Sequence, residues 1–538
     1  MLNIYPTKKM KEITKETWDH AEFTKTDIEE LMQRFHYSGE TMAIIRDEEL
    51  LPAGLLSRLH HAYPQHSGLR EEAAFLFNDK KYYSGLEGFR EIVGILSGHG
   101  IDIGHLEERE LFISVYRFMA TKHVLNTIKW DDFGNDSVFQ LVFPQPGMIR
   151  ADITEAWLNA TSREERETIV RNYIRETNPH DGKQQLNKPT FINEDGEIEV
   201  VEGSQHKYPQ CKLIFDEQTQ NCFAFCNYCF RHAQVRGDDD MFIQHDIHQV
   251  HEYLREHQEV TDVLITGGDA GFLKAARFEE YITPIIEDPA LRHIKTIRLG
   301  TRVLTYNPGL IITPAYNGML KLFKRLYDHG IQLAYMSHFS TPREVLNIST
   351  IAAIRRLKAH GVTVKSQSPV MNHISLFQKE NGAVDVDRSA QNWIDLANVF
   401  AMLGVGFHSM YLARPTGEFH YFNQPVAEIN KVFNKIYREL PSLNRPSRYI
   451  TQTSSAGKIS LLGTVDLPGQ KLFALKFNEA RNMEWMDKVY LVHYDEKENT
   501  IANLRPYGAD KHFYEDELAE IEHKLHSSIE TGRKKNIP

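Results

Sequence analysis

The sequence predicts an α/β fold: a partial (β/α)6 barrel with a helical N-terminal region and a small α+β C-terminal region. Two observations predict it. Short apolar, β-branched runs alternate with helical patterns between about residues 206 and 440, and glycines end the helical patterns just before the next run. We therefore divide the chain into a helical region (1–205), the barrel (206–440) and a C-terminal region (441–538).

Six apolar runs give the predicted strands of the barrel. Strands that alternate with helices pair in parallel through right-handed crossovers, and barrels of this kind carry their sites at the carboxyl ends of the strands. On strand count alone, an open doubly wound sheet remains the alternative. The six runs are 212–215, 262–266, 296–299, 332–336, 363–367 and 407–411.

The flanking regions have different patterns. Helical spacing dominates the N-terminal region, for example over 107–121 and 162–176. After the barrel come strand-like runs such as 488–492, and a charged helix is expected over 515–526.

Composition excludes several classes of protein. The 538 residues carry a formal net charge of -11, which argues against binding along the nucleic-acid backbone. The first 20 residues lack a signal-peptide core, and no stretch approaches the roughly 18 apolar residues of a membrane span. We expect a cytoplasmic protein that binds neither nucleic acid nor membrane.

Three of the four cysteines lie within eight residues. Cys222, Cys226 and Cys229 can surround a metal centre from one short loop, and soft thiolates suit iron–sulfur clusters and zinc. In an iron–sulfur cube, three protein ligands leave one iron free for a substrate or cofactor. The alternative is a zinc site completed by Cys211 or His232, although no second CxxC element is present.

The CxxxCxxC spacing after a first strand resembles the radical S-adenosylmethionine (SAM) superfamily. From about residue 206 to 462 the chain resembles the lysine 2,3-aminomutase family in particular, through the strand ending Gly-Gly-Asp-Ala at 267–270, Arg-Leu-Gly-Thr-Arg at 298–302, Ser-His-Phe at 337–339 and Gln-Ser at 367–368. The resemblance implies a radical SAM type of barrel, with a [4Fe–4S] cluster on the three cysteines and SAM on its free iron. The residues that it places near SAM are Gly267, Gly268, Asp269, Arg302, His338 and Gln367.

The family also uses pyridoxal phosphate (PLP), held on a lysine in a glycine-rich segment. The similar stretch here is 454–458, which implies that Lys458 carries PLP, although the family's four glycines are reduced to one. His-Lys-Tyr-Pro at 206–209 is similar to a family element that helps to hold the PLP phosphate. The resemblance assigns Lys207 and Tyr208 to that role, and Lys212 could add a second charge.

The substrate positions depart from those of the lysine enzymes. Arg231 falls where the family binds the substrate carboxylate. The two aspartates that hold the distal ammonium of lysine correspond to Arg414 and Thr451. Since Arg414 would repel an ammonium, we expect lysine to be a poor substrate and a carboxylate side chain, as in glutamate, to fit better. Alternatively, Arg414 turns outward or pairs with Glu418.

The resemblance implies an isomerase that moves the amino group of an α-amino acid from C2 to C3. It also implies an electron donor such as flavodoxin or ferredoxin, and it leaves a homo-oligomer open. Two alternatives stay open: a radical SAM enzyme that has lost PLP, and a non-catalytic zinc- or iron–sulfur-binding protein.

Overall fold

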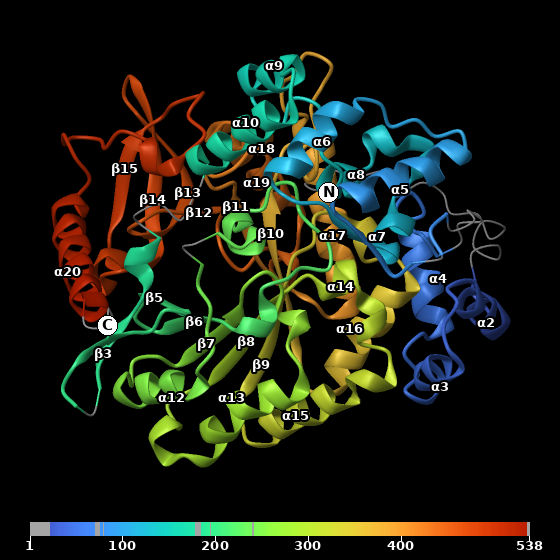
Figure 1. The fold of residues 1–538 in the computed structure, drawn as a ribbon, viewed down its shortest axis with the longest axis horizontal. Coiled ribbons are helices and arrows are strands. Elements are labelled where there is room, and N and C mark those ends of the chain that lie inside the picture. The colour runs from blue at the N-terminus through green and yellow to red at the C-terminus, as the bar shows by residue number, and fades with distance from the viewer. Residues whose placement is uncertain are drawn as a thin grey trace, which may run out of the picture.

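A large curved sheet forms the centre of the computed structural model, which describes residues 22–69, 76–78, 80–177, 184–193, 195–238 and 241–534 (Figure 1). The first 20 residues, on which the signal-peptide expectation rests, lie outside the described residues. Within the described ranges, no helix has both the length and the apolar character needed to cross a bilayer.

Six strands of this sheet lie side by side in chain order, and each is parallel to its neighbours. A doubly wound sheet reverses its strand order near the middle, whereas a barrel keeps chain order. All six predicted strands are therefore confirmed, and the doubly wound alternative is wrong. They are β6 (Cys211–Phe215), β7 (Asp262–Thr266), β8 (Thr296–Thr301), β9 (Gln332–Ser337), β10 (Thr363–Val370) and β11 (Gly406–Leu412).

Five further strands extend the sheet at its two ends. β5 (Ser204–Tyr208) pairs antiparallel with β6. At the other end, β12 continues the parallel order, and three antiparallel strands follow. β14 returns to contact β5, so the curved sheet is a barrel that is nearly closed. The strands beyond β11 are β12 (Thr451–Thr453), β13 (Gly457–Leu467), β14 (Gln470–Ala480) and β15 (Val489–His493).

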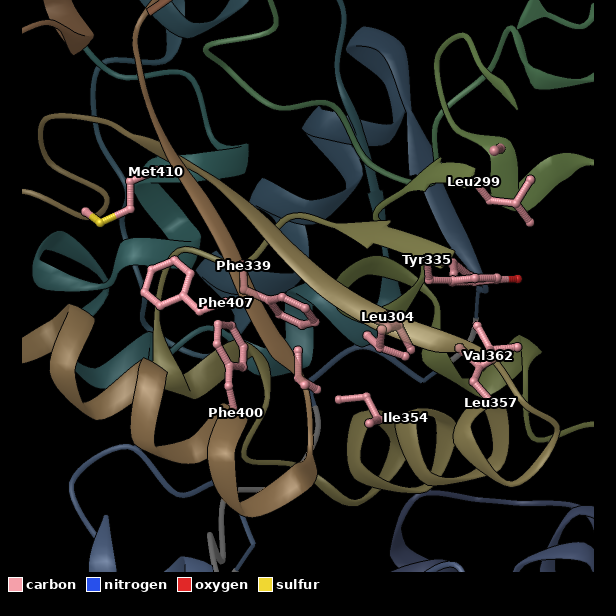
Figure 2. Packing of buried hydrophobic residues seen from close by; sticks show 14 of the residues in the cluster. Leu299, Leu304, Tyr335, Phe339, Ile354, Leu357, Val362, Phe400, Phe407 and Met410 are labelled. Carbon is pink, nitrogen blue, oxygen red and sulfur yellow. The ribbon is translucent and has the colours of Figure 1, made fainter. Parts of the chain in front are cut away.

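Helices cover the outer face of the parallel strands and enclose the main hydrophobic core. Figure 2 shows Phe407 of β11 beside Phe400 of α17, and the two ring centroids are 5.8 Å apart. In β8 the buried residues alternate with Arg298 and Gly300, which therefore face the barrel interior. The outer helices are α12 (Ile247–Glu256), α13 (Ala275–Glu287), α15 (Asn317–Asp328), α16 (Ile348–Ala359), α17 (Val386–Leu403) and α19 (Val426–Glu439).

The predicted glycine stops are also confirmed. Gly330, Gly361 and Gly404 have φ angles of 72°, 80° and 64°, in the left-handed region that a glycine adopts without a Cβ clash. Each lies between an outer helix and the next strand.

The N-terminal region is mainly helical, as predicted. Residues 23–69 contribute to the main hydrophobic core, and residues 77–173 form a second core together with barrel residues such as Phe225 and Tyr306. The helix predicted over 107–121 is too long at its carboxyl end. It stops at Val115, because residues 119–121 instead form a short strand that pairs with residues 82–84. The elements are α2 (Lys25–Arg34), α3 (Gly39–Asp47), α4 (Ala53–Ala62), β1 (Tyr82–Ser84), α5 (Gly85–Gly98), α6 (Leu106–Val115), β2 (Met119–Thr121), α7 (Lys122–Thr127), α8 (Ser137–Val142), α9 (Ala151–Asn159) and α10 (Arg163–Glu176).

Two smaller elements complete the description. A hairpin of β3 (Thr190–Ile192) and β4 (Ile198–Val200) packs against the closing helix α20 (Glu515–Lys534), which runs eight residues beyond its predicted end.

Candidate active site

The cysteine loop follows β6 at the carboxyl end of the parallel strands, and the N-terminal region holds it there. The backbone N–H of Phe225 donates to the carbonyl oxygen of Met119 at 2.8 Å, and that of Asn227 donates to Leu141 at 2.9 Å. The Asn227 side chain donates to the carbonyl oxygen of Phe143 at 2.6 Å. The helical region therefore provides part of the support for the metal site.

The three cysteines fit a cluster that contains several metal atoms. Burial raises the pKa of Cys229 to about 12 and raises that of Cys222 well above its usual range, so both thiolates need a cationic partner. Cys226 already has two hydrogen-bond partners: the hydroxyl of Tyr306 lies 2.9 Å from its sulfur, and Arg302 donates to the sulfur at 3.4 Å. Hydrogen bonds to ligand sulfurs are one of the ways in which proteins tune iron–sulfur clusters.

The geometry does not support the zinc alternative. Within the described residues, the three sulfurs do not all come within 4.8 Å of one another. Thiolates on a single zinc ion, with bonds near 2.3 Å, would be only about 3.8 Å apart. Cys211 begins β6, at the opposite end of the strand from the loop, and the ring of His232 packs edge-on against Tyr116 at 5.0 Å.

Arg302, predicted as a cofactor-binding residue, follows β8 and connects the cysteine loop to the segment after β9. Its guanidinium forms a buried ion pair with Glu344 at 2.6 Å and donates to the hydroxyl of Tyr228 at 3.0 Å. In this arrangement it positions the cysteine loop, and its contact with SAM stays a prediction.

Gly267 and Gly268 lie where β7 meets the start of the cysteine loop. A Cβ on Gly267 would lie 2.5 Å from the hydroxyl oxygen of Thr219, and one on Gly268 would lie 2.6 Å from the carbonyl oxygen of Asn221. Asp269 accepts hydrogen bonds from Thr301 and from the backbone N–H groups of 271 and 302. Close packing explains these residues, and their role toward SAM stays a prediction.

His338 and Gln367 come from the next two strands. His338 directly follows β9, and burial together with the charges of Arg302 and Arg231 lowers its pKa to about 3. Gln367 lies within β10 and alternates with the buried Ser366 and Ser368. The two residues thus lie on the same side of the barrel as the other residues predicted to be near SAM, toward the carboxyl ends of the strands.

The predicted PLP pocket contains several cations. The amine of Lys207 donates to the carbonyl oxygen of Ser454, and burial and the nearby charges of Arg481, Arg414 and Lys458 lower its pKa well below the usual range. The amine of Lys458 lies 5.1 Å from the centre of the Tyr208 ring. A phosphate would relieve the repulsion among these cations, so the residues fit PLP.

One contact of Lys458 was not foreseen. Its amine forms an ion pair with Glu479 at 2.5 Å, across the β13–β14 pair. Burial opposes the charge, but Tyr411 and Glu479 raise the pKa of Lys458 above its usual range. The amine is therefore held as an ammonium until something separates the pair.

Two further predicted residues lie in other surroundings. The suggestion that Lys212 adds a phosphate charge is wrong, because its amine lies 3.7 Å from the centre of the Tyr253 ring, on the outer face of β6 beneath α12. Thr451 is fully buried, and its hydroxyl bonds to the carbonyl of Tyr449 and to Ser460. Its role toward substrate stays a prediction.

Arg414 does not pair with Glu418, so the pairing that the sequence analysis gave as an alternative is wrong. The Glu418 carboxylate accepts hydrogen bonds from the hydroxyls of Tyr116 at 2.7 Å and Tyr173 at 2.9 Å. The Arg414 guanidinium instead lies 4.3 Å from the centre of the Phe230 ring, next to the cysteine loop.

Sequence reasoning missed Asn227, Tyr306, Glu344 and Glu479. Only Asn227 carried a local signal, because it lies between two cysteines. The other three reach the site through contacts made across distant parts of the chain.

Curated relatives are 2,3-aminomutases. The chain is 27% identical over 267 residues to a protein of Aquifex aeolicus provisionally named L-lysine 2,3-aminomutase, covering 49% of this chain and 66% of that one. It is 31% identical over 169 residues to glutamate 2,3-aminomutase of Clostridioides difficile, covering 31% and 37%. It is 30% identical over 175 residues to L-lysine 2,3-aminomutase of Clostridium subterminale, covering 32% and 39%. The matches thus span only 37% to 66% of these relatives' own lengths.

Solved structures add little. A radical SAM methyltransferase from Sphaerobacter thermophilus gives a TM-score of 0.28 at 15% identity, covering 49% of this chain and 76% of that one. Streptococcus suis SuiB gives 0.30 at 11% identity, covering 63% and 69%. At these scores the likeness carries no weight for function. No family model matches the chain.

A partial barrel with a three-cysteine loop after its first parallel strand is the arrangement that the sequence analysis expected of a radical SAM protein. The curated relatives support the predicted resemblance to the lysine 2,3-aminomutase family. The cofactors of this family are a [4Fe–4S] cluster, SAM and PLP.

Proposed function

We propose that this chain is a radical SAM, PLP-dependent aminomutase that moves the amino group of an acidic α-amino acid from C2 to C3. The observation that carries the acidic substrate is a pair of guanidinium groups beside the cysteine loop, neither of which forms an ion pair with a carboxylate of the described residues.

Arg231 and Arg414 both contact the ring of Phe230, at 5.2 Å and 4.3 Å from its centre. Arg231 donates to the hydroxyl of Thr266 at 2.5 Å and to the carbonyl oxygen of Gly267 at 3.1 Å. Burial and the charge of Arg414 lower the pKa of Arg231 to about 10. Two neighbouring half-buried cations without a carboxylate favour a ligand with two negative groups.

The division of labour follows from these positions. Arg231 holds the α-carboxylate close to the cluster, and Arg414 holds the distal carboxylate of the substrate. When bound, SAM and the cluster supply a carbon radical that removes a hydrogen atom, and PLP supplies a π-system for the amino shift. An electron donor such as flavodoxin or ferredoxin would reduce the cluster.

Steady-state assays of the anaerobically reconstituted enzyme with glutamate and lysine test the proposal. We expect glutamate to be preferred, and Arg414→Gln to lower its kcat/KM by roughly 100-fold, because a buried carboxylate would lose its partner. Iron content should not change. Arg438→Gln, at an exposed position of α19, is the matched control. A strong preference for lysine, or an unaffected Arg414→Gln, would contradict an acidic substrate.

The Lys458–Glu479 ion pair favours a second candidate, a radical SAM enzyme without PLP. An amine kept protonated cannot attack an aldehyde. Reconstitution with PLP separates the two candidates: protein-bound PLP absorbance that survives gel filtration supports the aminomutase, and its absence supports the second candidate.

A further inference from the structure

A second group of metal-ligating side chains lies away from the cysteine loop. His206 belongs to β5, and His257 and Glu259 belong to the segment that joins α12 to β7. One ligand atom from each lies within 4.8 Å of the other two, and no other three histidine, cysteine or carboxylate side chains of the described residues lie so close together. The segment enters β7 at its amino end, whereas the cysteine loop lies at the carboxyl ends of the parallel strands.

Hydrogen bonds show which nitrogen atoms can bind a metal. Nε2 of His206 lies 3.0 Å from the carbonyl oxygen of Pro209 and must donate to it, so Nδ1 is unprotonated. Its lone pair accepts a hydrogen bond from the Tyr253 hydroxyl at 2.5 Å, and an ion would take the place of that hydroxyl. Nδ1 of His257 lies 2.8 Å from a Glu259 oxygen, so the neutral imidazole keeps a lone pair on Nε2. Burial lowers the pKa of His206 to about 4, so protons do not compete for it near neutral pH.

The surroundings fix the orientation of both imidazoles. The Tyr253 ring stacks on His257 with centroids 3.9 Å apart and meets His206 edge-on at 5.7 Å. The Pro209 carbonyl fixes the tautomer of His206, as the hydrogen-bonded outer partners of metal-binding histidines usually do. The ligands are therefore already oriented before an ion binds.

We propose that His206, His257 and Glu259 bind a divalent transition-metal ion. Two imidazoles and one carboxylate suit Zn²⁺, with water as the fourth ligand of a tetrahedral site. The ion would tie β5 to the segment before β7. Since Lys207 and Tyr208 directly follow His206, it would also fix the backbone of two residues in the cationic pocket. The site does not depend on the proposed aminomutase activity.

A Zn²⁺ titration against a chromophoric chelator, on the full chain with its iron–sulfur cluster assembled anaerobically, tests the proposal. We expect one Zn²⁺ per chain in addition to the iron. His257→Ala and Glu259→Gln should each lower the affinity by at least about tenfold. His248→Ala is the matched control, because it removes an exposed histidine of α12 that pairs with Glu252 at 3.2 Å but has no third ligand.

Two further measurements make the result decisive. Zn²⁺ should raise the melting temperature of the wild type and of His248→Ala but not of the two ligand variants, since an ion that binds only the folded chain stabilises it. The triple cysteine-to-alanine variant should still bind one Zn²⁺. The proposal is overturned if the wild type binds no Zn²⁺, if the ligand variants bind it as tightly, or if the triple variant loses it.

Discussion

The cysteine loop and the Lys458 pocket belong to one barrel but are held in different ways. The loop is fixed by backbone hydrogen bonds and apolar contacts from the N-terminal region. The pocket is held by charge: Lys458, Glu479 and Arg448 form a chain of ion pairs, next to cations that repel one another. The comparison teaches that the metal chemistry depends on packing, whereas the substrate can change through a few charged side chains without altering the fold.

The strongest test on the loop side is removal of the three thiolates. Replacing Cys222, Cys226 and Cys229 with alanine should abolish iron and sulfide binding and all SAM cleavage, because the one remaining cysteine, Cys211, lies at the opposite end of β6 from the loop. Iron and sulfide analysis of anaerobically prepared protein measures the effect. The matched control is Cys211→Ala, at the far end of β6, which should keep its full cluster content.

On the pocket side, Lys458→Ala should abolish the absorption of protein-bound PLP and lower turnover below detection, while the cluster stays intact. The absorption spectrum after PLP reconstitution and desalting is the measurement. Lys471→Ala removes an exposed lysine of β14 and serves as control. Retention of PLP and activity by Lys458→Ala would mean that another group holds the cofactor.

The cysteine loop and the Lys458 pocket also differ in how much of each the sequence could predict. The six parallel strands and the cysteine triad were predictable because β-branched runs, glycine stops and ligand spacing are local patterns. The ion pair of Lys458 with Glu479 was not, because it depends on the pairing of β13 with β14. The end of α6 was also missed, because pairing of residues 119–121 with β1 prevailed over a local helical pattern.

A smaller effect is expected from loosening the support of the loop without touching a ligand. Asn227→Ala leaves the buried carbonyl groups of Gln140 and Phe143 without this donor, which should cost about 2–4 kcal/mol in the free energy of unfolding. Chemical denaturation of the cluster-loaded protein measures it. Asn135→Ala, which removes an exposed hydrogen bond to Asp132, should change stability by much less. Equal losses would mean that the loop does not depend on the N-terminal region.

The smallest expected effect concerns the electronic state of the cluster. Tyr306→Phe keeps the buried ring but removes the hydroxyl that lies 2.9 Å from the Cys226 sulfur. A donor to a thiolate stabilises the more negative, reduced cluster, so its loss should make the reduction potential more negative. A difference of about 1–2 kcal/mol between the oxidation states corresponds to about 40–90 mV. Redox titration followed by electron paramagnetic resonance gives the value. Tyr316→Phe removes a buried hydroxyl that bonds to Tyr335, away from the loop, and should leave the potential unchanged. If both variants keep the wild-type potential, the Tyr306 hydroxyl does not tune the cluster. Packing alone would then set the surroundings of the cluster, and polar side chains would matter only in the Lys458 pocket.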